Sequence, residues 1–185
     1  MTGANSAESV QETSPQLDRS AVARAGMSHP VNDVILDTNA VLDWLVFDDP
    51  AARLLGAAVR TRHLRWIATE PMRAELLDVL DRLDTHPPLM RWRAALAPAL
   101  AEVNCWMQLV PTPDPLSAAL QLHSTDPDDQ CFIDLALSRR VPWLISRDRA
   151  LLRLAGKARP RGVAVLTPQR WAALANPASP DSSPD

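Results

Sequence analysis

The 185-residue sequence has no tyrosine, only five glycines, and no apolar run of the roughly 18 residues that a membrane-spanning helix requires. So few glycines leave it without a glycine-rich loop of the kind that cradles phosphates. Its two cysteines, Cys105 and Cys131, have no CxxC or histidine-spaced partner, which predicts buried free thiols in a reduced cytoplasm. No basic segment precedes an apolar stretch at the N-terminus, so no secretory signal is expected. These absences predict a cytoplasmic protein with no membrane association.

The signatures of several enzyme classes are also missing. There is no GxSxG or Ser-His-Asp pattern, and His63, His86 and His123 are scattered without the spacing of zinc ligands. Lys157 is the only lysine, so the basic residues are almost all arginine. Arginine suits bidentate contacts with phosphate, although an arginine-rich composition is also typical of a GC-rich genome.

The formal charge of −3 comes from the two ends of the chain. Residues 1–30 carry −1 and the residues after Ala175 carry −2, which leaves the middle near zero. This excludes a strongly basic nucleic-acid binder but not a local basic surface. Residues 1–30 and 176–185 lack a hydrophobic period and are expected to be disordered, so a single domain is expected over residues 31–175. Met27 is an alternative start.

Apolar strand candidates alternate with helix candidates throughout this domain. Strands are expected at 34–37, 64–68, 106–110, 143–146 and 163–166, and helices at 40–47, 50–62, 70–83, 89–102, 116–122, 127–140, 149–154 and from 168 onward, with a break at His86–Pro88. Such alternation is typical of a parallel sheet with helices on both faces. The sequence therefore predicts an α/β fold of three layers, α/β/α, around a central, mostly parallel sheet of about five strands.

Acidic residues stand at the ends of two of these strands. Asp37 ends the apolar run that begins at Val34, and Asp148 follows the run that begins at Trp143. Ligands of such sheets bind outside the carboxyl ends of the strands, so we expect these carboxylates to converge. Each could instead be an ordinary turn residue, because aspartate is common where strands end.

Two further acids belong to the predicted helices. Glu75 lies inside the apolar stripe from Met72 to Leu83, where it could line a site or pair with an arginine such as Arg53. Asp129 crowds a helix N-terminus, where Asp126 as N-cap would form a capping box with it. Four acids at consistent positions of one sheet nevertheless favour a divalent cation, and oxygen ligands favour Mg²⁺ or Mn²⁺.

These residues resemble the PIN-domain family of metal-dependent ribonucleases. The resemblance covers about residues 34–171 and is carried by the motifs VILDTNAVLDWL, EPMRAELLDVL, DPDDQCFIDLAL and LISRDRALLRL, in this order. The ending VAVLTPQRW is similar to a subgroup that acts as the toxins of toxin–antitoxin pairs. The resemblance implies a PIN-like fold and hydrolysis of RNA to products with a 5′-phosphate and a 3′-hydroxyl.

The resemblance also assigns roles to individual residues. Asp37 and Asp129 would be the principal ligands of Mg²⁺ or Mn²⁺, with Glu75 and Asp148 completing an acidic catalytic pocket, although the neighbouring acids Asp126, Asp128 and Asp134 keep the third-motif ligand open. Asn39 and Ser146 would orient the ligands by hydrogen bonds. Arg147 stands where the family usually has a small residue; it and Arg149 are candidates for substrate contact, and Arg139–Arg140 are further positive neighbours.

The expected partners are RNA, a second copy of the chain in a homodimer, and an antitoxin that blocks the acidic pocket. Two alternatives stay open: a housekeeping RNA-processing or flap-type nuclease of the same fold, and a non-catalytic nucleic-acid-binding module. A phosphotransfer domain of the response-regulator kind would need a lysine near the acids, and Lys157 comes too late in the chain.

Overall fold

The computed structural model describes residues 31–85 and 91–175, in which five strands form one entirely parallel sheet of order β3-β2-β1-β4-β5. The strands are β1 (Asn32–Leu36), β2 (Leu64–Ala68), β3 (Gln108–Leu109), β4 (Trp143–Ile145) and β5 (Ala164–Leu166). The α/β fold predicted from the sequence is confirmed. The predictions for residues 1–30 and 176–185, for Met27 and for the break at His86–Pro88 lie outside the described residues.

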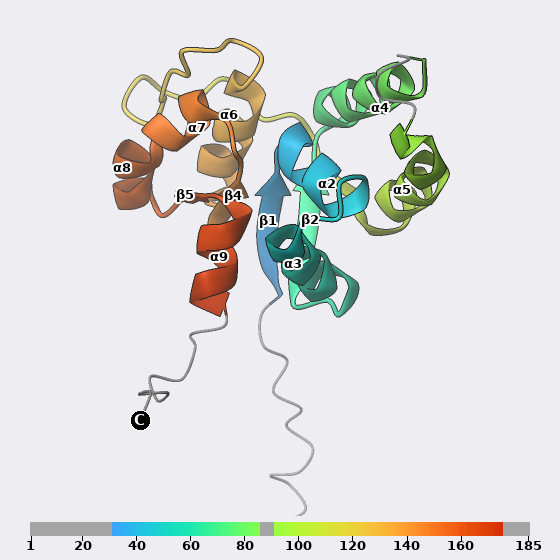
Figure 1. Ribbon diagram of the computed structural model, residues 1–185. Helices are drawn as coiled ribbons and strands as arrows, with labels where there is room; N and C mark the ends of the chain where they lie inside the picture. Colours follow the sequence, from blue (N-terminus) through green and yellow to red (C-terminus); the bar gives the residue numbers. More distant parts are fainter. Residues whose placement is uncertain (1–30, 86–90, 176–185) are drawn as a thin grey trace, which may run out of the picture.

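Helices connect the strands and cover both faces of the sheet (Figure 1). They are α2 (Thr38–Leu45), α3 (Pro50–Arg60), α4 (Glu70–Thr85), α5 (Arg93–Trp106), α6 (Gln130–Arg139), α7 (Arg149–Arg153), α8 (Ala155–Ala158), the 3-10 helix η2 (Arg159–Arg161) and α9 (Pro168–Ala175). No helix within the described residues is long and apolar enough to cross a membrane.

The alternation of side chains along β1 divides the core into two layers. Val34 and Leu36 are buried on the face covered by α2 and α3, whereas Ile35 is buried on the opposite face against α6 and α7. Successive residues of a strand point to opposite faces, so an entirely apolar strand is stable only when both faces are covered. The result is the predicted three-layer arrangement with β1 at its centre (Figure 1).

The chain order places a topological switch next to β1. The crossover through α2 and α3 leads to β2 on one side of β1, whereas the crossover through α6 leads to β4 on the other side. Val34 accordingly pairs with Trp66 of β2 and with Trp143 of β4. The helices on the two sides diverge at the carboxyl ends of β1 and β4, which is where ligands bind in open parallel sheets.

Two predictions for the segment before α6 are wrong. Residues 116–122 do not form a helix; only a single turn is present, in which Ser117 O accepts from Leu120 N and Gln121 N. Asp126 does not cap the following helix: its carboxylate accepts from Asp128 N in a tight turn, and α6 begins later, at Gln130. The capping-box interpretation of Asp126 and Asp129 is therefore also wrong, because Asp129 itself is the N-cap residue and makes no side-chain capping bond.

Candidate active site

Asp37 and Asp148 end the two strands that flank the topological switch, and each carboxylate caps the helix that follows. Asp37 Oδ1 accepts from Ala40 N at 3.1 Å at the start of α2, and Asp148 Oδ1 accepts from Ala150 N at the start of α7. Parallel pairing of Leu36 with Ile145 brings the two strand ends side by side. The convergence of these two acids, predicted from the strand ends, is thus reproduced by the register of the sheet.

Ser146 joins the two strand ends through its hydroxyl group. Its Oγ donates to Asp37 Oδ2 and accepts from Asp148 N at 2.8 Å, and the residue is fully buried. Asp37 is 2% exposed, and this burial raises the pKa of its carboxyl group, while the hydrogen bonds from Ser146 and Ala40 lower it. The carboxylate is therefore held in one orientation by a side chain of the neighbouring strand end.

Glu75 enters the same region from α4, on which it is half-buried. Thr38 Oγ1 donates to Glu75 Oε1 at 2.8 Å. Burial raises the pKa of Glu75, and the charges of Asp37 and Asp128 raise it further. The alternative pairing of Glu75 with Arg53 is not observed, since Arg53 pairs with Asp48.

Asp129 reaches the site from the start of α6 and is the least satisfied of the four acids. Its Oδ2 atom is buried and has no hydrogen-bond partner within the described part of the chain. Burial and the nearby charge of Asp148 raise its pKa to about 7, with smaller contributions from Asp37 and Asp126. Such a carboxylate binds a proton more readily than a solvated one, and a cation would stabilise its charged form.

The three further acids near Asp129 in the sequence, Asp126, Asp128 and Asp134, have other surroundings than the four candidate acids. Asp134 lies along α6 and accepts from Gln130 Nε2 at 2.8 Å, while Asp126 is exposed and bonds within its own turn. Asp128 is exposed and, together with Glu75 and Cys131, lines a hollow of about 440 Å³ between α4 and the start of α6. Asp129, in contrast, lies close enough to Asp148 and Asp37 for their charges to raise its pKa.

The donor set fits a divalent cation in its chemistry, because it consists of carboxylates, and burial and nearby negative charges raise the pKa of Asp37, Glu75 and Asp129. One of these carboxylates, that of Asp129, has a buried oxygen without a hydrogen-bond partner in the described chain. Over residues 31–85 and 91–175, however, no three His, Cys, Asp or Glu side chains are arranged closely enough to form a metal cage. Asp37, Asp129, Glu75 and Asp148 are therefore the residues that could hold a cation.

The residues expected to support or contact the site are placed as follows. Asn39 is exposed on α2, and its backbone N–H, not its side chain, donates a hydrogen bond to the Asp37 carboxylate. Arg149 is exposed at the first position of α7. Arg139 and Arg140 end α6, at the opposite end of that helix from Asp129, so they are not neighbours of the acids.

The Arg147 side chain contacts α2 and the α2–α3 connection and not the four candidate acids. Its Nε atom lies 2.6 Å from Asp43 Oδ2, and its terminal nitrogen donates to Asp49 Oδ2 at 2.7 Å. The first contact is ionic rather than a well-directed hydrogen bond, because Asp43 Oδ2 has no hydrogen-bond partner in the described chain. The two contacts tie the 146–148 connection to α2 and α3.

The thiols differ from expectation. Cys105 is exposed and Cys131 is half-buried, so the prediction that both are buried is wrong, although both are free. Burial, together with the charges of Glu75 and Asp129, raises the pKa of Cys131 to about 12. Cys131 is therefore a protonated thiol beside the acids and unsuited to bind a metal as thiolate.

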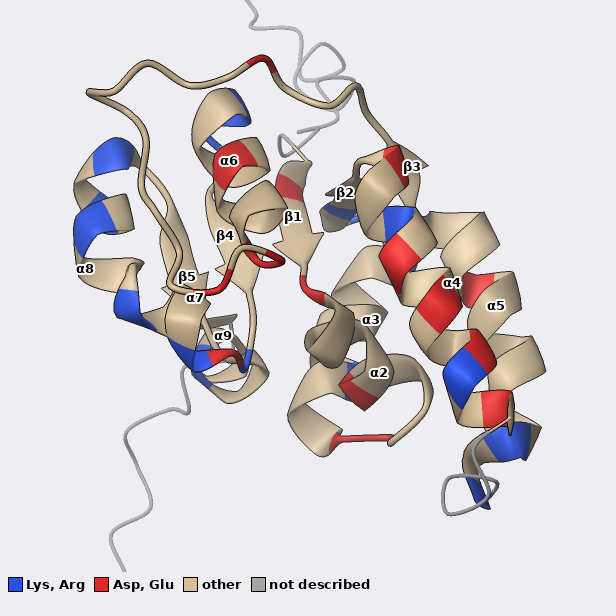
Figure 2. Ribbon diagram, turned by 90° about the horizontal axis from the view of Figure 1, so that it is seen from above, with Lys and Arg blue, Asp and Glu red and all other residues tan. Residues whose placement is uncertain are grey.

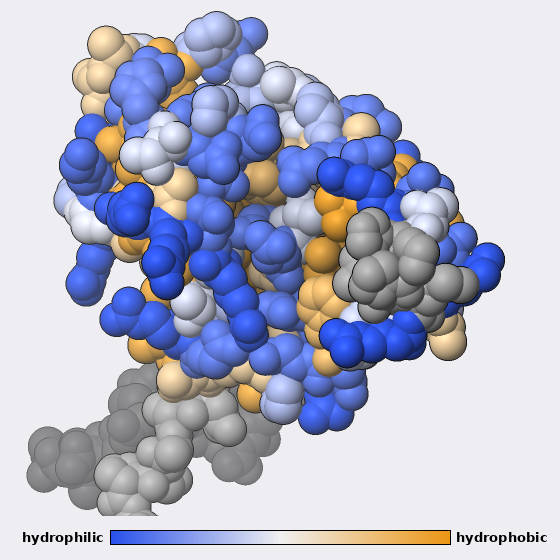
Figure 3. Space-filling model, turned by 45° about the horizontal axis from the view of Figure 1, so that its top comes forward, coloured by the Kyte–Doolittle hydropathy of each residue, from blue (hydrophilic) through white to orange (hydrophobic). Residues whose placement is uncertain are grey.

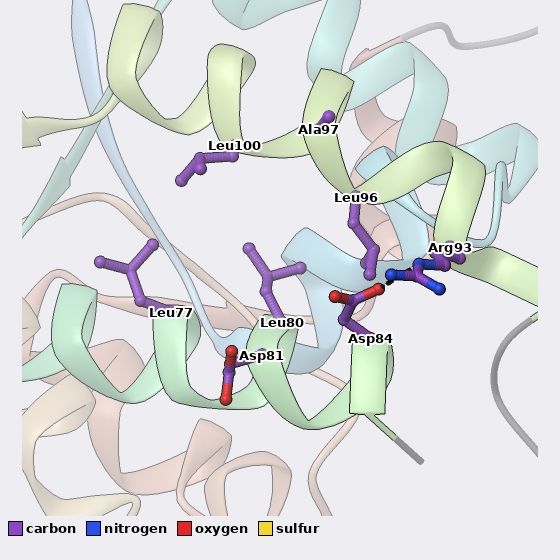
Figure 4. A pocket seen from close by; sticks show the side chains of 8 residues that line it. All are labelled: Leu77, Leu80, Asp81, Asp84, Arg93, Leu96, Ala97 and Leu100. Atoms are coloured by element: carbon purple, nitrogen blue, oxygen red, sulfur yellow. Dashed lines mark ion pairs between the residues drawn. The ribbon is translucent and has the colours of Figure 1, made fainter. Parts of the chain in front are cut away.

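A second cavity, of about 390 Å³, lies between α4 and α5 and does not include the acids (Figure 4). Its walls are Leu77, Leu80, Leu96, Ala97 and Leu100, and the ion pair of Asp84 with Arg93 crosses its rim. The face shown in the space-filling view is mainly hydrophilic, and hydrophobic side chains surface on it only in smaller areas (Figure 3). This apolar groove is therefore separate from the four candidate acids.

Thr38 and Asp43 are the residues near the site that the sequence analysis missed. Thr38 follows Asp37 directly, and a hydroxyl at the first position of a helix is a signal that could have been used. Asp43 is 8% exposed within an apolar helix, but its partner Arg147 is 104 positions away. No local pattern indicates a contact of that separation.

Comparison with known proteins agrees with the fold and the acids. No curated protein and no solved structure matches the chain. The sequence model of the family described as "PIN domain" matches residues 33–150, a span that contains all four acids and most of the chain. PIN domains are generally nucleases, which are hydrolases. With that span matched, the chain belongs to the PIN-domain family.

Proposed function

We propose that the protein is a metal-dependent endoribonuclease that hydrolyses RNA phosphodiester bonds in the cytoplasm, with Asp37, Glu75, Asp129 and Asp148 as its catalytic acids. The observation that carries the proposal is the unpaired, buried Oδ2 atom of Asp129 among carboxylates of raised pKa. A buried carboxylate oxygen without a donor, on a residue whose pKa is raised by burial and nearby acids, supports a role in binding a cation.

The roles of the acids are those that the resemblance to the family implies, and the hydrogen bonds of the site support them. Asp37 and Asp129 would hold Mg²⁺ or Mn²⁺, with Glu75 and Asp148 alongside. A bound cation would supply acidification of the attacking water and neutralisation of the charge that develops on the phosphate. The Ser146 hydroxyl fixes the orientation of Asp37, and Thr38 fixes that of Glu75. Arg149, exposed beside Asp148, would contact a phosphate of the substrate.

The proposal extends to the toxin of a toxin–antitoxin pair that forms a homodimer. It rests on the resemblance of the ending VAVLTPQRW to that subgroup. The test is growth of a bacterial host during induced expression of the protein and of its Asp37→Asn variant, with light scattering of the purified protein for the dimer. Growth arrest by the wild type alone supports a toxin, and equal growth contradicts it.

The ribonuclease is tested by cleavage of a labelled structured RNA with Mg²⁺, with Mn²⁺ and with EDTA. Asp37→Asn is the informative variant, because asparagine still caps α2 and the fold is retained. Asp126→Asn is the matched control, since it removes one exposed carboxylate a short distance away. We expect metal-dependent cleavage that is lost in Asp37→Asn and kept in Asp126→Asn. RNA binding without cleavage by the folded protein would support the non-catalytic binding module instead.

A further inference from the structure

The segment that follows Asp148 carries positive charge without compensation. Residues 149–161 contain five cations and no acid, and the next acid after Asp148 is Asp181. We call these five residues the basic ridge: Arg149, Arg153, Lys157, Arg159 and Arg161. Four of them recur at every fourth position of the chain, across the consecutive short elements α7, α8 and η2.

The basic ridge leads away from the acids along one flank of the molecule. It begins beside Asp148, at the carboxyl end of β4, and ends before β5, whose first residue Ala164 pairs with Trp143 at the start of β4. At its far end, Arg161 donates to Lys157 O at 2.7 Å and to Ala119 O at 3.2 Å. There Arg161 and Arg140 line a surface hollow of about 690 Å³.

Apart from Arg161, whose side chain donates to two backbone carbonyls, these cations form no contact that holds the described fold together. All except Arg161 are exposed, and none of the five lies within 4.0 Å of a carboxylate in the described parts of the chain. Most arginines between residues 31 and 106 do form such pairs: Arg53, Arg60, Arg65, Arg73, Arg82 and Arg93. Most arginines of residues 31–106 are thus neutralised by carboxylates of the chain itself, whereas the cations of the basic ridge remain available to an external anion.

The opposite flank of the site repels anions. Helix α4 carries five acids and two arginines, and both arginines are paired with acids of the same helix. In Figure 2 the acidic residues of α4 and the basic residues of α7 and α8 lie on opposite sides of the strand ends that carry Asp37 and Asp148. A polyanion that reaches the acids is therefore attracted along one flank only.

From this polarity we infer that the basic ridge binds the sugar–phosphate backbone of single-stranded RNA and leads it to the acids past Arg149, an inference that rests on the proposed ribonuclease function. A guanidinium group can donate two parallel hydrogen bonds to phosphate oxygens. A row of cations can therefore bind successive phosphates of an RNA backbone without contacting its bases. The nucleotides bound by the ridge lie outside the cleavage site. A longer RNA therefore binds more tightly than a short oligonucleotide that fills the acid site alone.

The experiment measures binding of fluorescein-labelled single-stranded RNA by anisotropy in EDTA over a range of salt concentrations, with the full chain. The variant is Arg153→Gln/Lys157→Gln. The matched control is Arg62→Gln/Arg91→Gln, which removes two exposed cations that have no carboxylate within 4.0 Å among described residues, from the other half of the chain. All four positions are exposed, so thermal unfolding should show both proteins folded like the wild type.

We expect the ridge variant to bind a long RNA on the order of tenfold more weakly at low salt, with a salt slope smaller by about 1.4, because each phosphate contact on a single strand contributes about 0.7. The control and the binding of a short oligonucleotide should stay unchanged. Equal losses in variant and control, or none in either, overturn the inference. Displacement of the RNA by less poly-glutamate than unlabelled RNA also overturns it, in favour of an acidic protein segment.

The two proposals fail in different ways. A protein that binds RNA through the ridge but never cleaves it refutes only the ribonuclease, because binding in EDTA needs no catalysis. A protein that cleaves RNA with metal, but whose ridge variant binds long RNA as tightly as the control, refutes only the ridge.

Discussion

The four acids of the site fall into two pairs that the fold treats differently. The strand-end acids, Asp37 and Asp148, cap helices with their carboxylates. The Ser146 hydroxyl links them, because it donates to the Asp37 carboxylate and accepts from Asp148 N. The helix acids, Glu75 and Asp129, cap nothing; Glu75 accepts one bond from Thr38, and Asp129 keeps a buried oxygen unpaired. The hydrogen bonds of the first pair therefore stabilise the fold, whereas those of the second pair add little to its stability.

This difference separates the structural from the functional content of an acidic cluster. A carboxylate that caps a helix would be kept even in a protein without a ligand. A half-buried carboxylate whose own pKa is raised by burial and by nearby negative charges, and which satisfies no N–H group, destabilises the metal-free fold. Glu75 and Asp129 are thus the better indicators of cation binding, and substitutions in the two pairs should have opposite effects on stability.

The largest effect is expected for Asp37→Ala. Alanine removes the cap of α2 and leaves the fully buried Ser146 hydroxyl without its acceptor. Loss of a cap costs about 1 kcal/mol, and an unsatisfied buried hydroxyl adds about 1–3 kcal/mol. Urea unfolding of the metal-free protein should therefore show the free energy of unfolding lowered by about 2–4 kcal/mol.

Asp37→Asn is the control for that substitution, because the amide oxygen of asparagine can still cap the helix while its NH2 group can donate to Ser146 Oγ. Its loss of stability should be well below that of Asp37→Ala, although both variants lose the charge. Equal stabilities of the two variants would show that the charge of Asp37, and not its hydrogen bonds, contributes to the fold.

The next effect tests the link that holds the 146–148 connection in place. Arg147→Met keeps an apolar stem but leaves the buried carboxylate of Asp43 without its cation. Since Arg147 is partly exposed, we expect a loss of about 1–2 kcal/mol in urea unfolding, between the values for surface and buried pairs.

A double variant isolates the pair. Adding Asp43→Asn removes the unpaired charge, so Arg147→Met/Asp43→Asn should recover part of the stability lost in Arg147→Met alone. If the two substitutions are simply additive, the contact contributes nothing beyond packing.

The strand-end acids were predictable from the sequence for a physical reason. The run from Val34 to Leu36 ends in a carboxylate, and parallel strands bring their carboxyl ends to one edge of the sheet. The register of Leu36 with Ile145 shows that this argument suffices for Asp37 and Asp148. The position of Glu75 within an apolar stripe likewise indicated an inward-facing acid, and the residue is half-buried.

The start of α6 and the partners of Arg147 could not be predicted, because they depend on contacts that the linear sequence does not show. The Asp126–Pro127 pair has the pattern of a helix start, but the Asp126 carboxylate bonds to Asp128 N within a turn. The amide of Gln130 is meanwhile engaged with Ser124 N and Leu122 O, which fixes the loop in front of α6. The partners of Arg147 were likewise out of reach, since its contact with Asp49 joins residues 98 positions apart.

A smaller effect is expected for Thr38→Val, which keeps the shape of the side chain and removes its hydroxyl. Glu75 then loses its hydrogen bond, so unfolding should be easier by about 0.5–1.5 kcal/mol. The same bond lowers the pKa of Glu75, so that pKa should rise in the variant, as followed by NMR titration of the carboxyl group. Thr38→Ser, which keeps the hydroxyl, is the control and should retain the wild-type pKa.

The smallest effect concerns the pH dependence of the metal-free protein. Because the pKa of Asp129 is raised to about 7, the folded protein retains a proton that the unfolded chain releases near pH 4. The folded state then binds more protons than the unfolded state, so the free energy of unfolding falls as pH rises from about 4 to about 7. The contribution should stay below about 1 kcal/mol, because solvent screens a carboxylate that is only partly buried.

Urea unfolding in EDTA at acidic and neutral pH measures this decline in the free energy of unfolding. The Asp129→Asn substitution should reduce the decline, and replacing EDTA by saturating Mn²⁺ should flatten it. If Asp129→Asn shows the full wild-type decline, the repulsion resides in the strand-end acids, and the division into two pairs is wrong.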